Sequence, residues 1–229
     1  MEVLFVATVL SLPLPSLEDP QTIIVALDDE KGDNDDNDNE DFEQENSIQI
    51  CCAWGDALVD GRLTYYISDE DSSEKQQETV RNAIEKWDKE INPLELEELP
   101  HIKESDIRVD FKRNNKQDIA GQTMSTFDGY GLISKIEIPI FKETSDYKFN
   151  NANIEQIAEH EMGHALGLGH ANFDGNLMAA LINGGTETIS ECEIKGVYEA
   201  NSWYLEDNDD GGSNSIPAYP KDDSITCDN

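Results

Sequence analysis

Residues 160–170 read His-Glu-Met-Gly-His-Ala-Leu-Gly-Leu-Gly-His, a stretch that holds three of the four histidines of the chain. His160 and His164 are four residues apart, so on a helix both imidazoles point to the same side, one turn apart. The glycines that follow allow the chain to turn at positive φ, and His170 can then return toward the first two histidines. Three imidazoles that leave a fourth position open to water are typical of a catalytic zinc site.

Glu161 directly follows the first of these histidines. This position places its carboxylate close to the metal while leaving it free to hold water. A general base at such a place takes the proton of the attacking water. The sequence therefore predicts a Zn²⁺ site of His160, His164 and His170, with Glu161 as the catalytic residue. The alternative is a helix that merely carries solvent-facing histidines.

The segment resembles the metzincin zinc proteases and, within them, the matrixins, the family of the matrix metalloproteinase catalytic domains. All fixed positions of H-E-x-x-H-x-x-G-x-x-H are filled, and Met178 follows the last histidine by eight residues, where matrixins place their Met-turn. The resemblance covers roughly Trp54–Leu205 and is most specific between the first histidine and this methionine. It implies an α+β fold of the zincin type, with a twisted, largely parallel mixed sheet, an active-site helix and a C-terminal helix. It also implies a zinc endopeptidase that acts on proteins or peptides.

Several matrixin features have no counterpart in this sequence. A second, structural zinc needs further histidines, and only His101 remains, which we expect at the surface. The Pro-Arg-Cys-Gly latency motif is absent, so Cys51 or Cys52 as a thiolate cap on zinc stands as an alternative to a disulfide. Ala180 stands where astacins and serralysins have an extra tyrosine ligand, and Ala179–Leu181 lacks the Pro-x-Tyr wall of the matrixin specificity pocket.

Hydrophobic periodicity places helices and strands around the motif. The predicted strands are Leu63–Ile67, Ile107–Phe111 and Leu132–Ile140, and the predicted helices are Ser72–Ile91, Asn151–Leu166 and a third that begins at Ser190 with Glu193 in a capping box. Pro139 cannot donate to a ladder, which predicts that its strand lies at a sheet edge. An extended substrate is expected to add to this edge through main-chain hydrogen bonds.

The length of 229 residues and the low hydrophobic fraction of 37% predict one compact domain with flanks. The predicted parts are a signal peptide (1–18), an acidic disordered linker (19–50), the catalytic domain (51–205) and an acidic tail (206–229). The apolar run Val3–Leu14 has the length of a signal-peptide core, with a buried strand as the alternative. A secreted, extracellular monomer is expected.

Fifty acidic residues against sixteen lysines and arginines give a net charge of −34. Such a surface repels phosphate backbones, which argues against nucleic acid as a partner and, after removal of the signal, against anionic membranes. The carboxylates either keep the chain soluble or attract Ca²⁺, for example at Phe127–Gly129 or Asn172–Asn176. Two non-enzymatic alternatives therefore remain, a metal-dependent binding module and a secreted acidic calcium-binding protein. Glu161 favours the enzyme, since a binder needs only the histidines.

The four cysteines, Cys51, Cys52, Cys192 and Cys227, permit two disulfides. Adjacent cysteines rarely bond to each other, because the bridge geometry is strained. If bridges form, Cys51 and Cys52 are each expected to reach one of the two distant cysteines.

Overall fold

The computed structural model describes residues 5–8, 22–24, 45–101, 104–113, 119–145, 147–183, 187–205 and 217–228. Most of the predicted signal peptide (1–18), most of the predicted linker (19–50) and the first part of the predicted tail (206–229) lie outside these residues. Within the described part of the chain, no helix is long and apolar enough to cross a bilayer.

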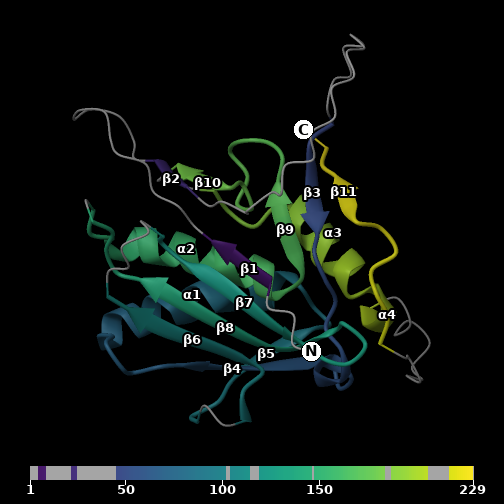
Figure 1. Ribbon diagram of the computed structural model, residues 1–229, viewed down its shortest axis with the longest axis horizontal. Coiled ribbons are helices and arrows are strands. Elements are labelled where there is room, and N and C mark those ends of the chain that lie inside the picture. The colour runs from purple at the N-terminus through teal and green to yellow at the C-terminus, as the bar shows by residue number, and fades with distance from the viewer. Residues whose placement is uncertain are drawn as a thin grey trace.

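A six-stranded mixed sheet forms the larger layer of the molecule (Figure 1). Its strands, in spatial order, are β1 (Phe5–Thr8), β7 (Gln122–Phe127), β8 (Ile133–Phe141), β6 (Ile107–Lys112), β4 (Arg62–Ile67) and β5 (Glu95–Glu98). The four strands from β8 to β5 run parallel, β7 is antiparallel to β8, and β1 is antiparallel to β7. The predicted α+β fold with a largely parallel mixed sheet is confirmed.

The prediction that the strand of Pro139 lies at a sheet edge is wrong, because β8 lies between β6 and β7. The pairs between β7 and β8 reach Glu137, and the next is an isolated bridge between Gly121 and Ile140. Pro139 falls in this interruption of the ladder, so its missing N–H group is tolerated inside the sheet. The strand next to the edge on this side is therefore β7, with only β1 beyond it.

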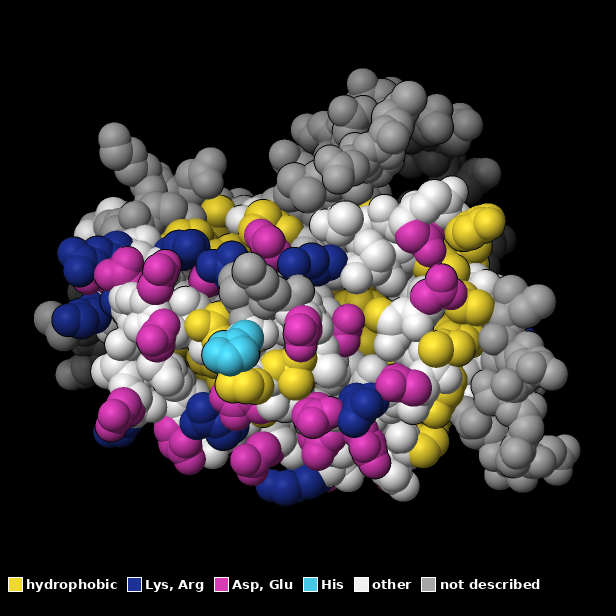
Figure 2. All heavy atoms as spheres, turned by 90° about the horizontal axis from the view of Figure 1, so that it is seen from below, with side chains coloured by type: hydrophobic (Ala, Val, Ile, Leu, Met, Phe, Trp, Pro, Cys, Tyr) yellow, Lys and Arg dark blue, Asp and Glu magenta, His cyan; other side chains and the backbone are white. Residues whose placement is uncertain are grey.

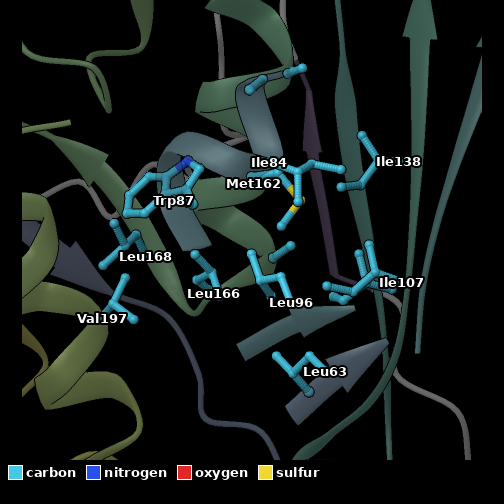
Figure 3. Close-up of a cluster of buried hydrophobic side chains, with 14 of the residues drawn as sticks. Leu63, Ile84, Trp87, Leu96, Ile107, Ile138, Met162, Leu166, Leu168 and Val197 are labelled. Atoms are coloured by element: carbon cyan, nitrogen blue, oxygen red, sulfur yellow. The ribbon is translucent and has the colours of Figure 1, made fainter. Parts of the chain in front are cut away.

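Helix α1 (Glu74–Glu90) begins at a capping box of Ser73 and Gln76, close to the predicted start. Its apolar face packs against helix α2 (Asn151–Ala165), and the indole Nε1 of Trp87 donates to the carbonyl of Glu159 at 2.8 Å. Figure 3 shows side chains of α1, α2, the large sheet and helix α3 (Glu191–Ala200) in one core cluster. This core fixes α2, the helix that carries the histidine motif, against the sheet.

A second, three-stranded sheet stands beside the first (Figure 1). Its spatial order is β11 (Ser224–Thr226), β3 (Ser47–Ile50) and β9 (Leu168–Ala171), all antiparallel. Both β3 and β11 lie outside the limits of 51–205 that the sequence predicts for the catalytic domain. The remaining elements are η1 (Asp56–Leu58), α4 (Ser202–Leu205) and the antiparallel pair of β2 (Thr22–Ile24) and β10 (Leu181–Asn183).

The disulfide prediction is also wrong. Cys51 is bonded to its neighbour Cys52, and Cys192 on α3 is bonded to Cys227. The second bridge forms because β11 and α3 both pack against β3, which brings the last two cysteines together. The first pair is left to bond internally, so the alternative of a free thiolate at Cys51 or Cys52 is not realised.

The charged surface is mixed. Figure 2 shows acidic side chains spread over one face among basic and apolar ones, with no single large acidic patch. Several of the few basic residues are paired with carboxylates, such as Arg81 with Glu78 and Glu98. This distribution agrees with a solvated surface.

Candidate metal centre

Helix α2 delivers the first two histidines of the motif. It begins at Asn150, whose side chain forms a capping box with Asn153, and it is buried along most of its length. At its other end, the indole Nε1 of Trp54 donates to the carbonyl of Ala165 at 2.8 Å, and the Asn201 amide donates to the carbonyl of Leu166 at 3.0 Å. These two donors satisfy carbonyls that a helix end leaves unpaired. They fix the point at which the chain leaves the helix.

The third histidine comes from β9, directly after the turn at Gly167. This glycine has φ +104, and a Cβ there would collide with the carbonyl oxygen of Cys52, so the turn requires glycine. His170 lies on β9, which pairs with β3 through Ala171 and Leu168. The third histidine is therefore held by a sheet rather than by a loop.

Met178 follows the histidine motif and is fully buried. A Cβ at Gly163, which lies between the two helical histidines, would collide with its sulfur. The carbonyl of Met178 also accepts from the N–H of Ala171 at 2.8 Å, next to His170. Met178 thus contacts both chain segments that carry the histidines, and its assignment as a Met-turn stays a prediction.

The three histidines converge. Each offers one ring nitrogen, and these atoms lie within 4.8 Å of one another. The three Nε2 atoms are buried and have no hydrogen-bond partner in the protein. The Nδ1 atoms of His160 and His164 lie 2.7 and 2.8 Å from the carbonyl oxygens of Leu177 and Leu168. A carbonyl only accepts, so both rings carry their proton on Nδ1 and present a lone pair on Nε2.

Burial keeps these rings neutral. It lowers the pKa of His164 to about 4 and that of His170 to about 3, and it places the pKa of His160 well below its usual range. Neutral imidazoles with converging lone pairs are the donor set that Zn²⁺ prefers, and carbonyls fix the outer nitrogens of His160 and His164, as is usual for metal-binding histidines. The residues present therefore fit a zinc ion. Among the described residues, this is the one group of three or more His, Cys, Asp or Glu side chains that could hold a metal ion. Binding of Ca²⁺ elsewhere therefore stays a prediction.

Glu161 lies fully buried beside this group. Its Oε2 accepts a hydrogen bond from the Thr123 hydroxyl at 2.7 Å, and its Oε1 has no partner in the protein. Burial raises the pKa of Glu161 to about 8, and the bond from Thr123 acts against this rise. Oε1 is therefore the oxygen left for a water molecule, which is the arrangement that a general base needs.

Comparisons with known proteins identify the family of this chain. The family model of the matrixins matches residues 53–200. The chain belongs to the matrixin family. Matrix metalloproteinase-19 of Homo sapiens is 32% identical over 114 residues, which cover 46% of this chain and 21% of that protein. Matrix metalloproteinase-C of Caenorhabditis elegans is 31% identical over 137 residues, which cover 52% of this chain and 22% of that protein.

The chain thus spans about a fifth of the length of these matrixin relatives. Matrixins are zinc endopeptidases. Membership in the family therefore supports zinc-dependent hydrolysis of peptide bonds at the level of the family.

Some residues of the site were not predicted from the sequence. Thr123 lies 38 positions before Glu161, and nothing in its local pattern signals this contact. Trp54 and Asn201 act at the end of α2 from positions far along the chain in both directions. His101, which the sequence places at the surface, is exposed and stands apart from the histidine group.

Proposed function

We propose that this protein is a secreted zinc-dependent endopeptidase in which His160, His164 and His170 hold the metal and Glu161 is the general base. The observation that carries the proposal is the set of three buried, unpartnered Nε2 atoms beside a buried carboxyl with a free oxygen. Buried polar atoms without partners are costly, and they persist where a ligand completes them. Membership in the matrixin family supports the same chemistry.

When bound, zinc supplies a Lewis acid that activates water and polarises the scissile carbonyl. The chain itself supplies the proton transfers. The free Oε1 of Glu161 receives the proton of the attacking water, and the same carboxyl then delivers it to the departing amine. Its burial excludes bulk water, so the proton stays in the site between the two steps.

We propose that the substrate is an extended peptide that pairs with β7. This replaces the expectation of pairing along Leu132–Ile140, because that strand is internal. The outer side of β7 accepts an extended strand, as its antiparallel pairing with Phe5–Thr8 illustrates. Main-chain pairing of this kind favours unfolded segments of proteins over small molecules.

Secretion is part of the proposal. Two disulfides are typical of chains that fold in an oxidising compartment. The apolar run Val3–Leu14 has the length of a signal-peptide core, while Phe5–Thr8 within it pairs with β7 as β1, as the strand alternative expects. The negative charge supports a monomer that binds neither nucleic acid nor anionic membranes.

The test is Glu161→Gln. The amide cannot accept the proton, yet no predicted ligand is removed, so the variant should keep one zinc per chain and lose ~10²–10⁴-fold in turnover of a denatured protein substrate.

Glu159→Gln is the matched control, because Glu159 is also buried on the same helix but pairs with Lys86 on α1. It should keep its turnover. Cleavage by Glu161→Gln at the wild-type rate would refute the mechanism. Zinc binding without cleavage by the wild-type protein would instead favour a metal-dependent binding module.

A further inference from the structure

Thr123 is the only described side chain that hydrogen-bonds the carboxylate of Glu161. It lies on β7 with an exposed fraction of 4%, and β7 packs against α2. Its Oγ1 is 2.7 Å from Oε2 of Glu161 and 3.0 Å from the backbone carbonyl oxygen of the same residue. The hydroxyl thus contacts this glutamate at two points.

This contact restricts a flexible side chain. Glutamate has three side-chain torsions, and a single strong hydrogen bond at one oxygen fixes the orientation of the carboxylate. The strand also limits the other side of the group, since a Cβ at Gly121 would lie 2.6 Å from Oε1 and 2.8 Å from Cγ of Glu161. Of the two oxygens, Oε2 is therefore engaged by the protein and Oε1 is left for water.

Two acceptors lie near the Thr123 hydroxyl, Oε2 of Glu161 at 2.7 Å and the backbone carbonyl oxygen of the same residue at 3.0 Å. A carboxylate oxygen is a stronger acceptor than a carbonyl oxygen, so the hydroxyl donates to Oε2. With Oε2 held in this way, Oε1, which has no partner in the protein, keeps one orientation toward the attacking water, as a preorganised site requires.

We propose that Thr123 is a positioning residue for Glu161, holding its carboxylate in the orientation that proton transfer needs. The proposal rests on the proposed function of the site. Thr123 belongs neither to the histidine motif nor to the predicted Met-turn. The hydroxyl carries this role, because it makes both contacts with Glu161.

The test compares Thr123→Val with Thr123→Ser. Valine keeps the shape and removes the donor, so kcat should fall about tenfold to a hundredfold, the range for a lost hydrogen bond to a charged group, while KM and zinc content stay unchanged. Serine restores the donor and should recover most of kcat. A merely structural role for the hydroxyl would lower thermal stability without this separation of kcat from KM.

Thr79→Val is the matched control. Thr79 is also buried, and its hydroxyl donates to the carbonyl of Lys75 at 2.8 Å on α1, away from the site. It should lose some stability and keep its kcat. If Thr123→Val kept the wild-type kcat, or if Thr123→Ser were as slow as Thr123→Val, the proposal would be overturned.

A second measurement does not depend on turnover. A double-mutant cycle of Thr123→Val and Glu161→Ala on the unfolding of the metal-free protein should show coupling, because each change removes one partner of the same bond. Additive effects would overturn the proposal even if kcat fell. If Glu161→Gln loses cleavage and Thr123→Val retains it, the positioning role of Thr123 is overturned and the proposed function stands. No cleavage by the wild-type protein overturns the proposed function.

Discussion

The double substitution Cys192→Ala with Cys227→Ala should lower both the stability of the protein and its affinity for zinc. The bridge joins residues 35 positions apart. The loop-closure model gives an entropy of about 13 cal/mol/K for a loop of this length, or about 4 kcal/mol at 25 °C. For a chain of this size each kcal/mol corresponds to roughly 2–4 °C, so the melting temperature should fall by about 8–16 °C.

Zinc affinity should fall as well, for a geometric reason. The bridge fixes β11 to α3, β11 pairs with β3, and β3 pairs with the strand of His170. Loosening the outer strand reduces the order of the third ligand. The assays are calorimetric melting with and without zinc, and competition for zinc with a chromophoric chelator at a temperature where the variant is folded.

The matched control is Cys51→Ala with Cys52→Ala. That bridge joins adjacent residues, so it encloses almost no chain, and its loss should change the entropy of the unfolded state very little. A similar loss of melting temperature in both double variants would refute the loop-closure argument. A melting temperature within 3 °C of wild type for the Cys192 and Cys227 variant would refute it directly, since ~8 °C is the smallest expected change.

Three further predictions follow from the site. Gly163→Ala should weaken zinc binding and cost about 1–3 kcal/mol, because its Cβ collides with the sulfur of Met178; chelator competition and urea unfolding check this. A chain that begins at Glu45 should cleave a peptide with kcat/KM at least equal to that of the full chain, because β1 and an extended substrate compete for β7; a lower value with unchanged folding would contradict the substrate position. The metal-free Glu161→Gln protein should lose a few kcal/mol of unfolding free energy between pH 6.5 and pH 4, since the folded pKa of His164 is lowered to about 4 and the unfolded state binds the extra protons. Stability from such a group is present above pH 6.5 and is lost as the pH falls. Glutamine replaces Glu161 because the raised pKa of this glutamate would make the folded protein more stable as the pH falls from 8 to 4.5, and would mask the effect of the histidine. Urea titrations at each pH give the change of unfolding free energy with pH.

The long, periodic elements could be predicted because their signals are local. Helix α1 shows its apolar stripe and its cap within one stretch of sequence. The spacing of the three histidines can likewise be read directly from residues 160–170. Pro139 misled the prediction because a local rule about donors was applied without knowing where the ladder is interrupted. The local preference was correct, but the sheet accommodates the missing donor between two pairs.

The non-local parts of the site could not be predicted in this way. The strands β3, β9 and β11 have three or four residues each, too few for a periodic pattern, and they exist because they pair with one another. The disulfide pairing depends on that same sheet, since only the folded chain brings Cys227 to α3. The contact of Thr123 with Glu161 depends on how β7 packs against α2.

The three-stranded sheet has a consequence for the time at which the metal site is completed during synthesis. Its pairs join Ile48 with Ala171 and Ile225 with Ile48. Strand β3 is therefore synthesised before both of the strands with which it pairs. A chain emerging from the ribosome can form α1, the large sheet and α2 first, with two histidines already in place on the helix. The outer strand β11 and its bridge can form only after Cys227 has been added, and contacts of such long sequence separation form slowly. We therefore expect the strand of His170 to gain its full support only after Cys227 has been added.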